Sequence, residues 1–374
     1  MKVRSLLTLS LLVAVSLSSF AQRYKDKIFT TVDTTKDVKY GAAMNVAGQM
    51  QDLLLDFYEP TGDLLEKRPL IIYIHGGGFT SGDKSELHIV GICDQMAKRG
   101  YVVANINYRL DPNFEVYNSN SDRRAMIDAM HDAKAAVRFF RKNAATYGVD
   151  TSFIVIGGES AGGATSMLVN YVDELSELNS YPMANPNTIE GNSGNPGYSS
   201  ETDYTLCLCA LMLDTSAINT GDQPMLWVHG TEDNFVPYSF AQTITTRAKN
   251  VDLEYTEYTF EGATHCPWYV TLPDWLEYLD TTINYITDFL YPKVTASLNP
   301  IEVSNIKVYP NPVRDMLTLS GTNSALVLSN QLGQELASLK NGPPSAERQV
   351  DVSFLKPGLY FLRSSEFTIK FIKE

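Results

Sequence analysis

Apolar and polar residues follow two alternating patterns between about residues 53 and 291. Short apolar runs rich in β-branched residues, such as 70–74 and 153–156, are typical of strands buried on both faces. Between them, apolar residues recur every three or four positions, as in 123–147, which predicts amphipathic helices. Further strands are predicted at 53–57, 101–106, 206–213, 225–228 and 253–258. This alternation predicts an α/β fold in which a mostly parallel sheet carries helices on both faces.

Three segments depart from this rhythm. Residues 22–39 are polar and are expected to form a loose lead-in. Residues 181–204 are rich in Asn, Gly, Pro and Ser without periodicity, which predicts a surface insertion near the functional site. A last amphipathic helix begins at Pro273 and is expected to stop at Pro292, because proline cannot donate a helical hydrogen bond.

The character of the chain changes after residue 305, where short apolar runs are joined by turn residues. These runs are 306–308, 317–319, 326–328, 359–362 and 367–372. They predict a small C-terminal β-sandwich. We therefore expect a large domain over 22–291, a linker over 292–305 and a small domain over 306–374.

The first residues predict export. Lys2 and Arg4 precede a nearly unbroken apolar run over 6–17, and a small-x-small sequence ends at Ala21. This pattern is typical of a secretory signal peptide, here 1–21. The run is too short to span a bilayer and no later run is long enough, so we expect no transmembrane segment in the mature chain.

Composition narrows the class of function. Hydrophobic residues make up 44% of the chain and charged residues 20%, which is typical of a globular protein. The formal charge of −13 and the lack of a Lys/Arg cluster argue against nucleic-acid binding, which needs a basic surface.

Four cysteines in an exported chain could form two disulfides: Cys93, Cys207, Cys209 and Cys266. Cys207 and Cys209 lie two apart in an apolar run, so both are expected on the same side of a strand, where core packing is the favoured role. A Cys-x-Cys pair with no neighbouring His or Cys in the sequence does not predict a metal site, and we expect none.

The run Gly-Glu-Ser-Ala-Gly over 158–162 carries the first candidate chemistry. It follows the buried strand 153–156 and precedes a helix-compatible segment, the context in which such a run forms a sharp turn that exposes its serine. Ser160 is therefore the predicted nucleophile.

A second motif, His-Gly-Gly-Gly over 75–78, follows the strand 70–74 directly. Its glycines allow backbone N–H groups to turn toward one point and hold an oxyanion. The N–H of Ala161, immediately after Ser160, would add a third donor.

A serine nucleophile needs a general base, and five histidines compete for that role. His265 lies in a turn after the last predicted strand, where the chain order serine, acid, histidine places the base. Structural roles are expected for the others: His75 in the glycine loop, His88 and His131 in helices, and His229 at a strand end, where its backbone position matters.

The acid should lie between Ser160 and His265 in the chain. Asp233 follows the predicted strand 225–228 and is expected to orient the imidazole. Asp214, after the preceding strand, is the rival, and Glu232 is expected to be solvated.

Together, the motifs at 75–78 and 158–162, with Asn-Tyr-Arg-Leu at 107–110 and Asp132, resemble carboxylesterases with a His-Gly-Gly-Gly loop. Those are the type B carboxylesterases and the hormone-sensitive-lipase-like esterases. The resemblance implies an α/β-hydrolase fold and ester hydrolysis through an acyl-enzyme, without a metal or organic cofactor. It also implies that Gly77, Gly78 and Ala161 are the oxyanion donors. Glu159 is closer to the type B pattern, but the chain is shorter than a type B enzyme, so the subfamily stays open.

The C-terminal segment resembles the sorting domain of type IX secretion cargo from Bacteroidetes. The resemblance rests on Tyr-Pro-Asn-Pro at 309–312, Pro-Gly-Leu-Tyr-Phe-Leu-Arg at 357–363 and the basic end 370–373. It implies that residues 306–374 engage the type IX machinery and are then removed, leaving a secreted or cell-surface protein.

The favoured function is a secreted serine carboxylesterase that acts on a small-molecule or polysaccharide-linked ester. Acetyl or feruloyl esters of plant polysaccharides are a hypothesis that rests on location alone. A serine peptidase of the same fold is one alternative, because the same three residues cleave peptides. A non-catalytic binding module of this fold is another, although such proteins normally lose one of the three residues.

Overall fold

The computed structural model describes residues 22–115, 123–181, 187–270, 272–297, 306–321, 326–330, 334–340, 347–363 and 368–374. The predicted signal peptide, 1–21, lies outside these residues. Across the described segments, no helix combines the length and apolar character needed to cross a membrane.

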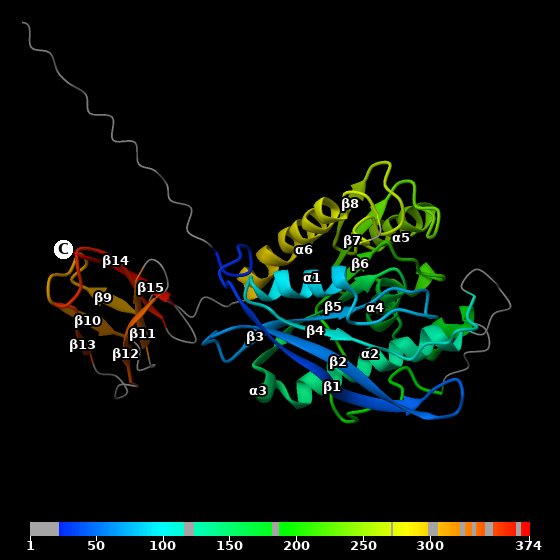
Figure 1. The fold of residues 1–374 in the computed structure, drawn as a ribbon, viewed down its shortest axis with the longest axis horizontal. Helices are drawn as coiled ribbons and strands as arrows, with labels where there is room; N and C mark the ends of the chain where they lie inside the picture. The colour runs from blue at the N-terminus through cyan, green and yellow to red at the C-terminus, as the bar shows by residue number, and fades with distance from the viewer. Residues whose placement is uncertain are drawn as a thin grey trace, which may run out of the picture.

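An eight-stranded sheet forms the centre of the large domain (Figure 1). Its strands are β1 (Val32–Met44), β2 (Met50–Pro60), β3 (Arg68–Ile74), β4 (Val102–Ile106), β5 (Val149–Glu159), β6 (Tyr204–Leu208), β7 (Met225–Gly230) and β8 (Tyr255–Phe260). They lie in the order β1-β2-β4-β3-β5-β6-β7-β8. The pairs β1–β2 and β2–β4 are antiparallel and all other neighbours are parallel, which confirms the predicted mostly parallel sheet.

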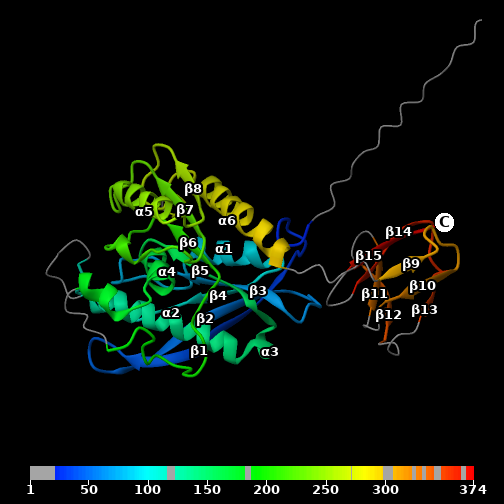
Figure 2. The same cartoon turned by 180° about the vertical axis from the view of Figure 1, so that it is seen from behind.

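Helices cover both faces of the sheet (Figures 1 and 2). Helices α1 (Leu87–Ala97) and α6 (Trp275–Ser297) share one apolar cluster with the sheet, and we call this side the α1/α6 face. Helices α2 (Arg124–Lys142), α4 (Ala161–Tyr171) and α5 (Ser239–Asn250) pack on the other side, the α2/α4 face. Short helices α3 (Ala144–Tyr147), η1 (Leu175–Ser180) and η2 (Thr215–Ala217) complete the domain. The apolar stripe predicted for α2 is buried from Met126 to Phe140, and each large side chain in it contributes about 1.5–3 kcal/mol.

Strand β1 begins at Val32 and so includes 32–39, the second part of the loose lead-in expected for 22–39, and for that part the prediction was wrong. The strand lies at the sheet edge and most of its first half is exposed. An edge strand held by ladder hydrogen bonds needs few apolar residues, and apolar alternation therefore could not reveal it.

Helix α6 continues through Pro292 to Ser297, whereas the sequence predicted a stop at Pro292. Pro292 and Asp288, one turn before it, are both exposed, so water can satisfy the Asp288 carbonyl that loses its helical partner. Buried Leu290 and Val294 hold the following turn against the sheet. Part of the predicted linker is therefore helical.

The described part of the insertion, 187–204, lies along α2 and β1 rather than beside the candidate site. The Ser193 carbonyl accepts the Ala42 N–H at 2.9 Å, and the Ser193 hydroxyl donates to Asp132 at 2.6 Å. Arg138 of α2 donates to the Glu190 and Gly194 carbonyls. Backbone carbonyls of this non-periodic segment therefore accept hydrogen bonds from β1 and α2.

All four cysteines are free and buried. Cys207 lies on the α2/α4 face, whereas Cys209 lies on the α1/α6 face with Cys266, so the prediction of a shared side was wrong. Strand β6 ends at Leu208, and Cys209 has a left-handed backbone with φ 49°. That turn breaks the two-residue alternation and redirects the Cys209 side chain.

The C-terminal segment forms two antiparallel sheets, as predicted. One holds β13 (Arg348–Asp351), β10 (Met316–Ser320) and β9 (Lys307–Tyr309); the other holds β12 (Glu335–Leu339), β11 (Leu326–Asn330), β14 (Gly358–Arg363) and β15 (Thr368–Lys373). Apolar residues from both sheets, including Leu317 and Leu328, form one core. Strands β12 and β13 were not predicted, because both are short, β12 is mostly exposed and β13 is mostly polar.

Candidate active site

Ser160 occupies a sharp turn between β5 and α4. Its φ of 53° and ψ of −118° lie outside the regions that non-glycine residues normally adopt. The Ser160 N–H donates to the Leu208 carbonyl at 2.8 Å and the Ser160 carbonyl accepts the Ala164 N–H at 2.9 Å. Such strain persists only where the surroundings hold it, and it is typical of functional sites.

Glycine at position 162 permits this turn. A Cβ atom at Gly162 would lie 2.0 Å from the Ile74 carbonyl oxygen at the end of β3. The first turn of α4 therefore packs directly against the end of the neighbouring strand, which only a residue without a Cβ atom permits.

Three predicted side chains meet at the carboxyl edge of the sheet. Asp233 lies in the loop after β7, and His265 lies in the loop after β8. His265 Nδ1 is 2.7 Å from Asp233 Oδ2, and His265 Nε2 is 2.9 Å from Ser160 Oγ. The structure thus brings the three residues into one hydrogen-bonded row, with the imidazole between carboxylate and hydroxyl.

The Asp233 carboxylate is surrounded by donors. Its Oδ1 accepts the backbone N–H groups of Phe235 and Val236, each at 2.8 Å. Its Oδ2 also lies 3.2 Å from Nε2 of the buried His229. Burial alone would raise the pKa of this carboxyl, but hydrogen bonds from His229 and His265 hold the pKa well below its usual value.

The imidazole of His265 responds to opposing influences. Burial acts to lower its pKa, while the adjacent Cys266 sulfur and the Asp233 carboxylate act to raise it, and the net shift is upward. Sequence reasoning missed the side-chain role of His229. The strand-end position of His229, four residues before Asp233, was the available signal.

The rival acid Asp214 has a different role. Its side chain precedes η2 and accepts the Ser216 N–H at 2.9 Å and the Ser216 hydroxyl at 2.6 Å. This is an ordinary capping arrangement. Glu232 is exposed, as expected.

The glycine loop lies next to Ser160, since a Cβ at Gly76 would be 3.3 Å from Ser160 Cβ. The Tyr108 hydroxyl donates to the His75 and Gly76 carbonyls, each at 3.2 Å, and the Tyr108 ring stacks on His75. Arg109 forms a buried bidentate pair with Asp132 of α2. The motif at 107–110 therefore supports the loop and does not enter the chemistry.

Comparisons with known proteins agree with this architecture. Residues 55–194 match the BD-FAE family, and residues 307–374 match the secretion system C-terminal sorting domain. Esterase 2 of Thermogutta terrifontis phosphorylated by paraoxon has a similar structure, with a TM-score of 0.54 and 24% identity over 71% of this chain and 95% of that one. The propionate-bound form gives a TM-score of 0.55 at 23% identity, over 72% and 97%. The large domain has an α/β-hydrolase fold.

Curated proteins similar to this chain include esterases. The para-nitrobenzyl esterase of Bacillus subtilis is 37% identical over 98 residues, which are 25% of this chain and 19% of that protein. A probable isoprenylcysteine alpha-carbonyl methylesterase of Oryza sativa subsp. japonica is 25% identical over 56% of this chain and 54% of that protein. The chain thus spans about half or less of the length of these relatives.

Beneath the turn at Ser160 lies the buried carboxylate of Glu159, whose partners were not predicted from the sequence. Glu159 Oε1 is 2.6 Å from His88 Nε2 of α1, and Glu159 Oε2 accepts Trp268 Nε1–H at 2.6 Å and the Tyr73 hydroxyl at 3.3 Å. Burial acts to lower the pKa of His88, but the Glu159 charge raises it, with a net upward shift. Glu159, the residue directly before Ser160, is therefore linked through Trp268 to the loop that carries His265.

Glu159→Gln is expected to lower the free energy of unfolding by about 3–5 kcal/mol, because it breaks a buried ion pair and turns an amide N–H toward a donor. Denaturant titration measures this. The exposed Glu232→Gln is the matched control, with an expected change within about 0.5 kcal/mol. Equal effects of the two substitutions would contradict the structural role of Glu159.

The raised pKa of His88 sets the pH dependence of this effect. The His88–Glu159 pair stabilises the folded chain fully below the unfolded imidazole pKa, and this contribution is lost as pH rises through the folded value. The difference in free energy of unfolding between wild type and Glu159→Gln should therefore shrink as the pH rises above the folded-state pKa of His88.

Gly77→Ala tests the glycine loop. Gly77 has φ +103°, and a Cβ there would lie 2.0 Å from the Ser81 carbonyl oxygen, so the loop must move. If its N–H groups hold an oxyanion, kcat for ester hydrolysis should fall about 10²–10³-fold. Gly48→Ala also adds a side chain at positive φ, but with no atom within 4 Å, and should leave kcat unchanged. Steady-state rates that fall equally in both variants would contradict the prediction that the glycine loop holds the oxyanion.

Proposed function

We propose that the large domain is a serine carboxylesterase with Ser160 as nucleophile, His265 as general base and Asp233 as the acid that orients it. The observation that carries the proposal is the continuous row from Asp233 Oδ2 to His265 Nδ1 at 2.7 Å and from His265 Nε2 to Ser160 Oγ at 2.9 Å. The esterase relatives and the match to the BD-FAE family support the same reaction class.

The row assigns a direction to proton transfer. His265 Nδ1–H donates to the ionised Asp233, which leaves the Nε2 lone pair facing the Ser160 hydroxyl. Ser160 Oγ attacks the ester carbonyl while Nε2 takes its proton, and the imidazolium then protonates the leaving alcohol. Water, deprotonated by the same nitrogen, releases the acid from Ser160.

Backbone N–H groups of Gly77, Gly78 and Ala161 are proposed to hold the oxyanion. Ala161 is the first residue of α4, where an N–H has no partner within the helix and the helix dipole favours negative charge. The glycine loop lies against the Ser160 side chain at Gly76. Donors on both sides of the attacking oxygen suit a tetrahedral intermediate.

Short or aromatic acyl groups are the proposed substrate class, including acetyl and feruloyl esters. The Phe235 side chain is 73% exposed and its ring stacks on His265 with centroids 5.6 Å apart, which offers a flat apolar surface beside the base. Structures of the similar Thermogutta terrifontis esterase contain propionate and butyrate.

Hydrolysis rates on p-nitrophenyl acetate to palmitate, acetyl-xylan, methyl ferulate and an aminoacyl-nitroanilide test this proposal. Esters with short or aromatic acyl groups should be cleaved fastest. Faster cleavage of the nitroanilide would indicate a peptidase instead. No turnover of any substrate, together with no labelling by a fluorophosphonate, would indicate a binding module.

We further propose that the chain is exported, with residues 306–374 engaging the type IX secretion machinery. The match of 307–374 to the sorting domain supports this, and so does the predicted signal peptide over 1–21. Intact-mass measurement of the protein from culture medium and cell surface should find a chain that lacks both ends. A chain retained inside the cell with both ends intact would contradict the proposal.

A further inference from the structure

The hydroxyl of Tyr269 lies beside the candidate nucleophile, although the sequence gave no reason to select this residue. A Cβ atom at Gly76 would lie 2.8 Å from Tyr269 Oη and 3.3 Å from Ser160 Cβ, so both side chains border the same small space. The Tyr269 ring also meets the His265 ring edge-on, with centroids 6.2 Å apart. Tyr269 therefore lies where the glycine loop, the base and the nucleophile come together.

The main chain and the ring of Tyr269 are both held in place. Its N–H donates to the Cys266 carbonyl at 3.0 Å, and its carbonyl accepts the Leu272 N–H at 2.9 Å. Its ring packs against the His88 imidazole, with centroids 4.7 Å apart, and His88 is bound in turn by Glu159. The hydroxyl is therefore positioned before a substrate arrives, which lowers the entropic cost of using it in a transition state.

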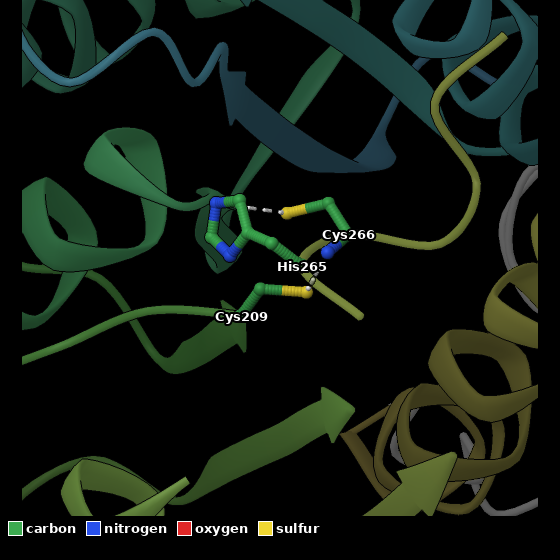
Figure 3. A group of neighbouring side chains, drawn as sticks. All are labelled: Cys209, His265 and Cys266. Atoms are coloured by element: carbon green, nitrogen blue, oxygen red, sulfur yellow. Dashed lines mark hydrogen bonds between the residues drawn. The ribbon is translucent and has the colours of Figure 1, made fainter. Parts of the chain in front are cut away.

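Two cysteines support the loop that carries His265 and Tyr269. Figure 3 shows the Cys266 sulfur beside the His265 ring, 3.7 Å from Nε2, and the Cys266 N–H donates to Cys209 Sγ at 3.1 Å. The Cys266 sulfur is also within hydrogen-bonding reach of the Tyr269 hydroxyl. Because sulfur is a weak acceptor, an ester oxygen can take its place at that hydroxyl.

The Tyr269 hydroxyl remains a hydrogen-bond donor over the working range of an esterase. Burial is the largest cause that raises its pKa well above the usual value, and the neighbouring Cys266 and Glu159 act in the same direction. The residue is nevertheless partly exposed, so the hydroxyl group is not sealed inside the core.

We propose that the Tyr269 hydroxyl donates a hydrogen bond to the alcohol oxygen of the ester as the bond between that oxygen and the acyl carbon breaks. Negative charge builds on this oxygen, which takes its proton from protonated His265 Nε2, while Tyr269 keeps its own proton. Tyr269 belongs to the same loop as His265, four residues later, so its hydroxyl and Nε2 approach the leaving oxygen from neighbouring positions. This role rests on the proposed function of Ser160 and His265, and it favours esters of weakly acidic alcohols, such as alkyl and sugar hydroxyls.

Tyr269→Phe tests this role, because it keeps the ring and removes only the oxygen. Ethyl acetate and p-nitrophenyl acetate form the same acetyl-enzyme, so a difference in kcat/KM between them comes from acylation. Ethoxide is strongly basic and leaves only with help from donors, whereas p-nitrophenolate is a weak base that leaves with little help. The variant should lose about 10–100-fold in kcat/KM on ethyl acetate, as for a hydrogen bond to a charged group, and less than about threefold on p-nitrophenyl acetate.

Tyr285→Phe is the matched control. Tyr285 lies on α6, is also partly exposed, and stacks on Tyr258 of β8 with centroids 3.9 Å apart. Its variant should keep both values of kcat/KM within about twofold of wild type. Both variants should label with a fluorophosphonate at the wild-type rate, which shows that the nucleophile and the base are intact.

Equal losses on the two esters in Tyr269→Phe would overturn the proposal, because the hydroxyl would then act on the oxyanion or on the position of His265. An unchanged kcat/KM on ethyl acetate would overturn it as well, and so would a wild type that cleaves p-nitrophenyl acetate but not ethyl acetate. A wild type that cleaves neither ester and does not label would contradict the proposed function, and the role of Tyr269 with it.

Discussion

Ser160→Ala is expected to lower kcat for ester hydrolysis by about 10⁴–10⁶-fold, the largest effect of any single substitution in this chain. The hydroxyl is the atom proposed to bond to the acyl carbon, and alanine offers no nucleophile. Binding and oxyanion donors persist, so a residual rate about 10³–10⁴-fold above water is expected. KM should change little, because the lost group acts on the transition state.

Ser166→Ala is the matched control for this experiment. Ser166 lies on the same helix α4, is fully buried, and donates to the Gly163 carbonyl at 2.7 Å. It is expected to keep kcat within tenfold and to label with a fluorophosphonate, whereas Ser160→Ala should not label. Full activity in purified Ser160→Ala would show that another group is the nucleophile.

The parallel core strands were predictable because burial on both faces leaves a continuous apolar run, as in β3 and β5. Strand β1 carries no such signal, since its stability comes from ladder hydrogen bonds to β2. The continuation of α6 through Pro292 depends on which side of the helix faces solvent, and a local proline rule does not contain that information.

Chain order and loop position favoured the three residues that meet in the row, although chain order alone left Asp214 as a rival acid. Each follows a strand of a parallel sheet, and the carboxyl ends of such strands share one edge, so Ser160, Asp233 and His265 were expected to converge. The partners of Glu159 were not predictable, because His88 and Trp268 reach it from two other elements. The direction of the Cys209 side chain was not predictable either, because it depends on the left-handed backbone of Cys209 itself, directly after β6.

Asp233→Asn is expected to lower kcat about 10⁴-fold near neutral pH. An asparagine amide facing Nδ1 favours the tautomer whose proton sits on Nε2, and that nitrogen can then no longer accept the Ser160 proton. The hydrogen bonds from Phe235 and Val236 can still reach the side-chain oxygen, so the loop should keep its conformation. Asp214→Asn keeps an oxygen that can cap η2, so it should cost little stability and cause no comparable loss of rate.

The pH profile separates an electrostatic role of Asp233 from a purely structural one. Burial lowers the pKa of His265, but the Cys266 sulfur and the ionised Asp233 raise it, and the net shift is upward. Only the neutral imidazole acts as base, so kcat/KM in wild type should fall as pH drops through a value above the ordinary imidazole pKa of about 6.5. Loss of the charge should move this limb to lower pH in Asp233→Asn, while Asp214→Asn should keep the wild-type limb. If instead Asp214→Asn lost the rate and moved the limb, Asp214 would be the acid, and the 2.7 Å contact between Asp233 and His265 would have no part in catalysis.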